Sequence, residues 1–189
     1  MTSNAGRAGA FAATDRGQPV QIFGSAEPFY IFDPKPGDID LEVIAHALSL
    51  QCRFGGHCRV FYSVAQHCVL TARILHDSYW RHEALMHDAA EAYIGDVVRP
   101  LKMHLDLYQS AEAKLERVIA QRFELDYPWP AEVKEADAIM LATEKRDLLA
   151  PNDGDWGPMP EPLPWTIDPW PPEEAKARFL ADAKAMGLK

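Results

Sequence analysis

Apolar residues recur three and four positions apart along most of the 189-residue chain, a spacing that predicts amphipathic helices. Asp38 or Asp40 can cap the first helix and Ser63 the second, because such short side chains accept hydrogen bonds from the free N–H groups of a helix start. The pattern predicts five helices in sequence and then a last one, over about residues 41–51, 64–75, 81–95, 107–123, 130–150 and from Glu173 onward.

Two segments depart from helical spacing. The stretch "PVQIFGSAEPFYIF", residues 19–32, has strand character and predicts a short β-hairpin. The segment from Pro151 to Pro172 is too rich in proline for a helix, and its three tryptophans predict an ordered covering loop. The expected fold is therefore all-α with a minor N-terminal β-hairpin, in a single domain over residues 1–189 whose first thirty residues are variable.

Composition narrows the choice of protein class. With 48% hydrophobic and 25% charged residues the chain can build one core, and no apolar run approaches the 18 residues that span a membrane. A cytoplasmic protein without a membrane partner is expected, with its three cysteines reduced. The net charge of −9 argues against binding a nucleic-acid polymer, although one local pocket could still hold a small anion.

The stretch "EALMHDAAEAYIGDVVRPLK" carries the first candidate chemistry. In a helix Glu91 lies one turn beyond both His87 and Asp88, so the three side chains can converge. Two carboxylates beside apolar positions are costly unless a positive charge stands between them, and imidazole with carboxylate suits a divalent metal. The dipeptide itself is weak evidence, because His76-Asp77 is another in the same chain.

A divalent ion needs further ligands, and two residues on other predicted helices are candidates. His67 stands among apolar residues in the middle of the second helix, where an unpaired imidazole would be costly. Asp137 is placed in the same way in "KEADAIMLATE". The alternative for His67 is a core histidine bonded to a backbone carbonyl.

The order of His67, His87-Asp88 and Asp137 resembles the H…HD…D signature of the HD-domain metal-dependent phosphohydrolases. The motifs "YSVAQH", "MHDAAEAYIGD", "RPLK" and "EADAIMLATE" are similar to those of the bacterial 5′-deoxynucleotidase branch and of the related phage dATP triphosphohydrolases. The resemblance covers roughly residues 33–149. It does not extend to the first thirty residues or to the proline-rich loop.

This resemblance implies an HD-domain helical fold and one bound divalent ion, which could be Mn, Co, Zn, Fe or Mg. Its ligands would be His67, His87, Asp88 and Asp137. Such an ion can lower the pKa of a bound water and polarise a phosphate together. Glu91 corresponds to an acid implicated in catalysis, and Asp96 to the aspartate of the "GD" step, although which carboxylate performs which proton transfer stays open.

The resemblance also implies a set of substrate contacts. Arg53-Phe54 falls where the deoxynucleotidases carry an Arg-Trp pair that contacts the nucleotide, so Phe replaces Trp here. Arg99 and Lys102 can neutralise phosphate charge with Arg53. A solvated surface position for Lys102 is an equal alternative.

The expected function is hydrolysis of a deoxynucleotide at its 5′ α-phosphorus. A monophosphatase would release phosphate and a triphosphohydrolase would release triphosphate, and the sequence leaves both open. The alternative of another class is a non-catalytic nucleotide-binding regulatory HD module. Self-association into a homo-oligomer is expected from the resemblance.

Overall fold

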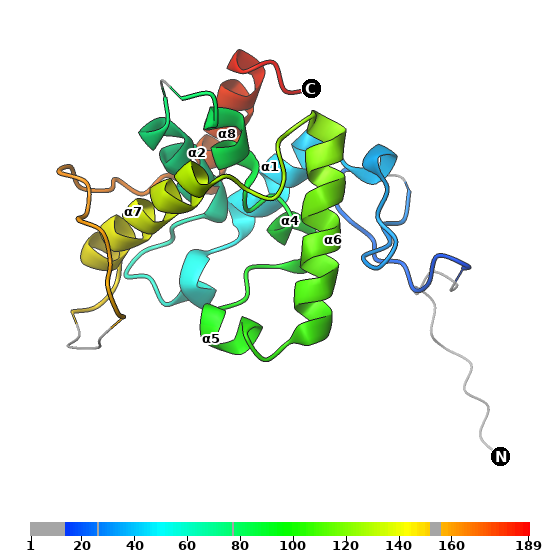
Figure 1. Ribbon diagram of the computed structural model, residues 1–189, viewed down its shortest axis with the longest axis horizontal. Helices are drawn as coiled ribbons and strands as arrows, with labels where there is room; N and C mark the ends of the chain where they lie inside the picture. The colour runs from blue at the N-terminus through cyan, green and yellow to red at the C-terminus, as the bar shows by residue number, and fades with distance from the viewer. Residues whose placement is uncertain (1–13, 26, 77, 152–155) are drawn as a thin grey trace.

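The computed structural model describes residues 14–25, 27–76, 78–151 and 156–189, and it confirms the prediction of a helical protein (Figure 1). The described α-helices are α1 Leu41–Leu50, α2 Val64–Ile74, α3 Arg81–Met86, α4 Glu91–Ile94, α5 Arg99–Lys102, α6 Asp106–Phe123, α7 Ala131–Leu148 and α8 Pro172–Ala185. Two short 3₁₀ segments, η1 Pro36–Asp38 and η2 Arg53–Gly56, precede α1 and α2.

Two of the helix starts follow from side-chain caps. The Asp40 carboxylate accepts the N–H of Val43 at 3.0 Å, and the Ser63 hydroxyl accepts the N–H of Gln66 at 3.1 Å. Each bond satisfies a donor that the first helical turn would otherwise leave free. Of the two caps considered for α1, Asp40 is therefore the one that the structure uses.

The expected β-hairpin over residues 19–32 is wrong, because within the described part of that stretch a single antiparallel bridge joins Val20 and Phe29. The Ser25 hydroxyl bonds both backbone groups of Glu27, so Glu27 has no free partner for a ladder. On the other side, the N–H of Asp33 bonds the carbonyl of Tyr30 in a turn. Local turn bonds therefore stop the pairing in both directions. Residues 1–13 of the expected variable segment lie outside the described residues.

The single helix expected over residues 81–95 is also corrected, because α3 and α4 are separated by a turn at residues 87–90. There the backbone bonds span three residues instead of four, as from Ala89 to Met86 and from Glu91 to Asp88. This 3₁₀-like tightening turns the chain between His87 and Glu91. Interruptions of this kind often mark functional segments of helices.

Helix α2 forms the centre of the molecule and is buried from Val64 to Ala72. It packs against α1, α3, α7 and α8, while α6 stands at one side and contacts η1 and α5 (Figure 1). The proline-rich segment runs over α2 and α7, where Gln66 bonds the backbone of Asp168 and Trp170 at 2.8 Å each. In the described part of the chain no helix is both long and apolar enough to cross a membrane.

Candidate metal centre

Two buried histidines on different helices form the core of the site. His67 on α2 has no exposed surface, and His87 follows α3 directly and is also buried. The His87 Nδ1 lies 2.8 Å from the carbonyl oxygen of Ala84, and the His67 Nδ1 lies 2.6 Å from a Glu144 carboxylate oxygen. A carbonyl only accepts, so the His87 Nδ1 carries the proton, and the Glu144 carboxylate favours the same tautomer for His67.

This arrangement directs both Nε2 atoms toward one point. The two Nε2 atoms are 3.2 Å apart, and the His67 Nε2 lies 3.1 Å from Asp137 Oδ1 and 3.5 Å from Asp88 Oδ2. Metal–nitrogen bonds of about 2.1 Å place neighbouring ligands about 3.0–3.4 Å apart in octahedral or tetrahedral geometry. Ligand atoms of His67, His87 and Asp137 therefore lie close enough together to hold one ion, and Asp88 lies beside them with an oxygen within 3.5 Å of each Nε2 atom. The Asp137 side chain, 43% exposed, leaves this point open to solvent.

The surroundings of the cluster favour a positive charge on His67. Burial and Arg53 lower the pKa of His67, yet Glu144 and Asp137 outweigh them and raise it to about 9. Burial raises the pKa of Asp137, but its bonds to His67 and His87 outweigh burial and hold that pKa well below the usual range. Without a metal ion a proton on imidazole supplies the charge, and a divalent cation would displace it.

Glu144 and Arg53 form a second layer around the histidines. Arg53 NH1 lies 3.2 Å from Asp88 Oδ2, and its NH2 lies 3.2 Å from Glu144 Oε2. Burial raises the pKa of Glu144, but Arg53 and His67 outweigh it and keep that pKa below its ordinary value. A carboxylate on the far nitrogen of a metal-binding histidine fixes the ring and increases its basicity.

The sequence analysis did not single out Glu144 as a site residue. The signal was present, because Glu144 follows Asp137 by seven residues, two helical turns along the same face of α7. Glu144 is also the last residue of the motif "EADAIMLATE", whose Asp137 was expected as a metal ligand.

Glu91, the expected catalytic acid, lies at the start of α4 and is 8% exposed. Its Oε2 is buried and makes no hydrogen bond. Burial, with Asp88 and Asp96 nearby, raises the pKa of Glu91 well above the usual range. A buried carboxyl group with one free oxygen beside the cluster can hold a proton or orient a water, which are the roles of a general acid or base.

Asp96 and Phe54 meet across the same region. The Asp96 carboxylate accepts the backbone N–H of Phe54, and burial raises the pKa of Asp96 while Arg53 lowers it less. Phe54 has φ 57°, in the left-handed region that side chains other than Gly rarely adopt. Such strained residues concentrate at functional sites. The half-buried Phe54 ring is thus held next to Arg53, whose guanidinium lies 5.4 Å from the ring centre.

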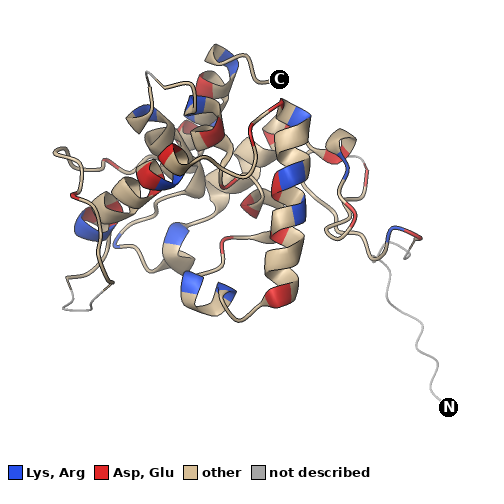
Figure 2. Cartoon of the chain, in the orientation of Figure 1, with Lys and Arg blue, Asp and Glu red and all other residues tan. Residues whose placement is uncertain are grey.

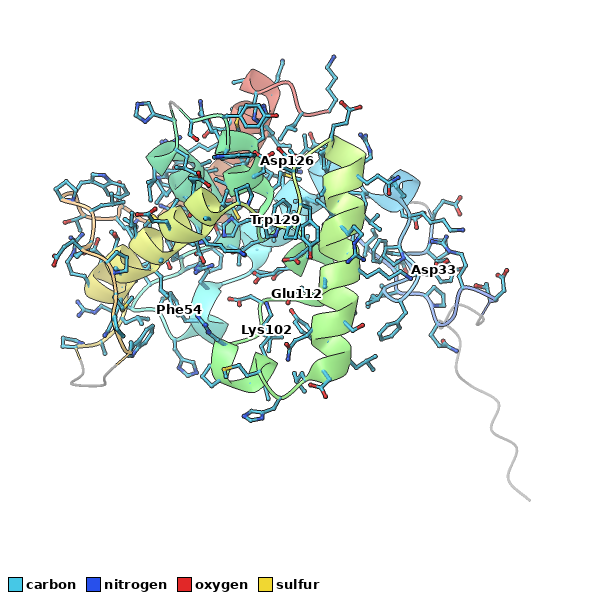
Figure 3. All side chains as sticks on the ribbon, viewed as in Figure 1. Asp33, Phe54, Lys102, Glu112, Asp126 and Trp129 are labelled. Carbon is cyan, nitrogen blue, oxygen red and sulfur yellow. The ribbon has the colours of Figure 1, made fainter. Side chains whose placement is uncertain are left out.

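The structure separates the two cations expected on α5. Lys102 bonds Glu112 Oε1 at 2.6 Å, and Figure 3 shows these side chains meeting between α5 and α6. Arg99 is exposed at the first position of α5. The basic residues of η2 and α5 lie on the same side of the view in Figure 2. Lys102 is therefore partly buried and paired with an acid on α6, and its contact with a phosphate stays a prediction.

A thiol lies beside the cluster and was not considered as a ligand from the sequence. Cys68 is buried and could contribute to a second three-residue group with His87 and Asp88. Burial, with Asp88 and Glu91 nearby, raises the pKa of Cys68 well above its usual range. Because thiolate, and not thiol, binds metals, the oxygen and nitrogen ligands of the first group are the better set.

Comparison with known proteins identifies relatives over about four fifths of the chain. The chain is 42% identical over 160 residues to the uncharacterized protein YfdR of Escherichia coli (strain K12), and the match covers 82% of this chain and 89% of YfdR. The chain belongs to the YfdR family. The chain is also similar to an uncharacterized protein of Rhodobacter capsulatus, 29% identical over 170 residues that cover 80% of this chain and 87% of that protein. No protein-family profile matches the chain.

Proposed function

We propose that this member of the YfdR family is an HD-domain metal-dependent phosphohydrolase that acts on deoxynucleotides. The observation that carries the proposal is the meeting of His67, His87 and Asp137 at spacings that suit one divalent ion, with an Asp88 oxygen within 3.5 Å of each Nε2 atom. The motif resemblance supplies the substrate class, and the buried Glu91 beside the cluster supplies an acid–base group.

Each residue has a task in this proposal. A bound divalent ion would lower the pKa of water and polarise the phosphate. Glu91 would orient the attacking water with its free oxygen, and Asp96 would exchange a proton with the leaving oxygen. Arg53 would hold Asp88 and Glu144 in place and offset part of their charge.

The charges at the site favour a monophosphate over a triphosphate substrate. Arg53 and Lys102 are the two cations that lower the pKa of Glu91, and both are already paired with carboxylates. A monophosphate brings about two negative charges to this acidic region, whereas a triphosphate brings more and needs further cations. We therefore expect a 5′-deoxynucleotidase that releases inorganic phosphate.

The decisive experiment is a panel of deoxy- and ribonucleotide mono-, di- and triphosphates, assayed with Mn²⁺, Co²⁺, Zn²⁺, Fe²⁺ and Mg²⁺. The proposal expects phosphate from deoxynucleoside monophosphates, and release of triphosphate would instead indicate a triphosphohydrolase. Asp137→Ala should lose the ion and the activity together while circular dichroism shows that the helices remain. Full metal occupancy and wild-type turnover in that variant would remove the site assignment.

Glu91→Gln separates an enzyme from a non-catalytic nucleotide-binding module. The change keeps size and hydrogen bonding but removes the carboxylate, so metal and nucleotide should still bind. We expect kcat to fall by roughly 10²–10⁴-fold, the range of a general acid–base group. Nucleotide binding without turnover in the wild-type protein would favour the regulatory module.

A further inference from the structure

Gln51 joins the two ends of the segment that carries both proposed acid–base residues. It follows α1, and its side-chain amide donates from Nε2 to the carbonyl oxygen of Glu91 at 3.0 Å. Its Oε1 accepts the backbone N–H of Asp96 at 3.1 Å. One carboxamide therefore fixes the start and the end of residues 91–96, which comprise α4 and the two residues after it and are called the acid–base turn below.

The other bonds of this turn hold its middle and one side chain. The Gly95 N–H bonds the Glu91 carbonyl at 2.7 Å, and the Tyr108 hydroxyl donates to the Gly95 carbonyl at 2.6 Å. The Asp96 carboxylate accepts the N–H of Phe54. Gln51 supplies the bond to the Asp96 amide, so its loss frees the backbone at the residue whose carboxylate must be placed.

The backbone of Gln51 connects this turn to the metal-binding helices. Its carbonyl accepts the N–H of Val64 at 3.1 Å, at the start of the helix that carries His67. Two residues later Arg53 binds Asp88 and Glu144. Because Gln51 bonds both the turn and the start of α2, it sets the distance between the acid–base groups and the cluster.

We infer that Gln51 is a positioning residue that holds Glu91 and Asp96 in register with the metal cluster. The catalytic roles of Glu91 and Asp96 rest on the proposed function. That Gln51 holds this turn in place rests on the hydrogen bonds alone. Gln51 itself touches neither the cluster nor a reacting atom in this scheme.

The chain offers a matched control in Gln66. Its carboxamide also donates to one carbonyl and accepts from one N–H, those of Asp168 and Trp170, both at 2.8 Å. Gln66→Leu removes the same pair of bonds from the proline-rich segment instead of from the acid–base turn. Gln51→Leu and Gln66→Leu therefore share the chemical change and differ in what it releases.

The test uses the full chain loaded with Mn²⁺ and a deoxynucleoside monophosphate. Gln51→Leu should keep its metal stoichiometry and KM within about twofold, while kcat falls about 10- to 100-fold, the scale expected when catalytic groups are misplaced by about 1 Å. Gln66→Leu should lower the melting temperature and leave kcat within about twofold of wild type.

Hydrogen exchange of the Asp96 amide gives a readout that needs no turnover. Gln51→Leu should accelerate this exchange, and Gln66→Leu, which leaves the bond to the Asp96 amide intact, should keep the wild-type rate. An unchanged Asp96 exchange rate in Gln51→Leu, equal exchange in both variants, or an unchanged kcat overturns the inference. If the wild-type protein hydrolyses no nucleotide, the proposed function fails, and the exchange rates still decide whether Gln51 holds the turn.

Discussion

At the scale of single residues, the site is defined by which nitrogen of each histidine is available. Ala84 and Glu144 occupy the Nδ1 atoms, so both Nε2 atoms face the carboxylates of Asp88 and Asp137. Each Nε2 atom lies within 3.8 Å of an oxygen of both carboxylates, and their lone pairs repel one another unless a cation lies among them. The need for a positive charge therefore follows from the contacts, independently of any resemblance.

Glu144→Gln tests the outer layer of this arrangement. The variant keeps the size of the side chain but removes the charge that orients His67 and balances Arg53. We expect metal affinity to fall about 10- to 100-fold, the usual effect of losing such a partner. Titration of the metal-free protein with Mn²⁺ measures it.

The matched control is Glu116→Gln. Glu116 lies on α6 and accepts hydrogen bonds from Tyr127 and Trp129 in the loop that follows. Its metal affinity should remain that of wild type. Equal metal affinity in the Glu144→Gln variant and the wild-type protein would show that Glu144 does not support His67 as a ligand.

Phe54 is the residue that tests sugar selection. If its half-buried ring lines the sugar, the 2′-hydroxyl of a ribonucleotide loses its partners, which costs roughly 1–3 kcal/mol. Deoxy substrates should then be preferred about 5- to 150-fold in kcat/KM. Phe54→Trp should widen and Phe54→Ala should narrow the ratio for one base; a constant ratio across the three proteins would place sugar recognition elsewhere.

The sequence could indicate residues of the centre but not their partners. His67, His87, Asp88 and Asp137 stood out because polar groups at apolar helix positions need an explanation. The bonds of Glu144, Gln51 and Glu112 depend on how separate helices are arranged, and helical periodicity carries no information about that arrangement.

At the scale of elements, the chain departs from a regular helix over residues 87–96, which contain the turn at 87–90, the short helix α4 and its end at Gly95. Gly95 ends α4 with φ 82° and ψ 155°, a conformation that is essentially restricted to glycine. The space around it is open, so an added Cβ would meet no heavy atom within 4 Å. Backbone strain alone therefore decides the effect of a side chain at this position.

Gly95→Ala should destabilise the protein by about 1–3 kcal/mol and reduce kcat, because the strained backbone leads directly into Asp96. Gly37→Ala is the control, since Gly37 is equally open but has no positive φ. Denaturant unfolding of both variants measures the difference. Equal stability of the two variants would mean that the turn relaxes without strain.

The longer helices were largely predictable, because α6, α7 and α8 extend over at least 14 residues and α1 and α2 carry clear caps in Asp40 and Ser63. The departures are short. The break after α3, the four-residue α5 and the single Val20–Phe29 bridge are set by local bonds and tertiary contacts, not by hydrophobic spacing. Patterns average over about two turns, so they cannot resolve features of four residues.

At the scale of the whole molecule, the site gathers acids within a fold whose net charge is −9. Three acids on two structural segments, Asp88, Asp137 and Glu144, approach two buried imidazoles. The fold tolerates this because Arg53 and a protonated His67 offset part of the charge when no metal is bound. The stability of the protein must therefore depend on pH and on metal together.

This dependence has a definite direction. In the metal-free protein the pKa of His67 is about 9, above its ordinary value of about 6.5, so its contribution to stability is complete below pH 6.5 and disappears as the pH rises to 9. The carboxylates with lowered pKa values, Asp137 and Glu144, lose their contributions to stability only in acid.

A metal ion competes with the proton for Nε2, so it binds more tightly as the pH rises. Metal at 100 times its Kd adds about 2.7 kcal/mol to the free energy of unfolding. We therefore expect the melting temperature of the chelator-treated protein to fall between pH 6.5 and 8.5, and the increase caused by Mn²⁺ to grow over the same range. Asp137→Ala should show no such increase at any pH. A metal effect that shrinks as the pH rises would contradict coordination by the His67 and His87 nitrogens.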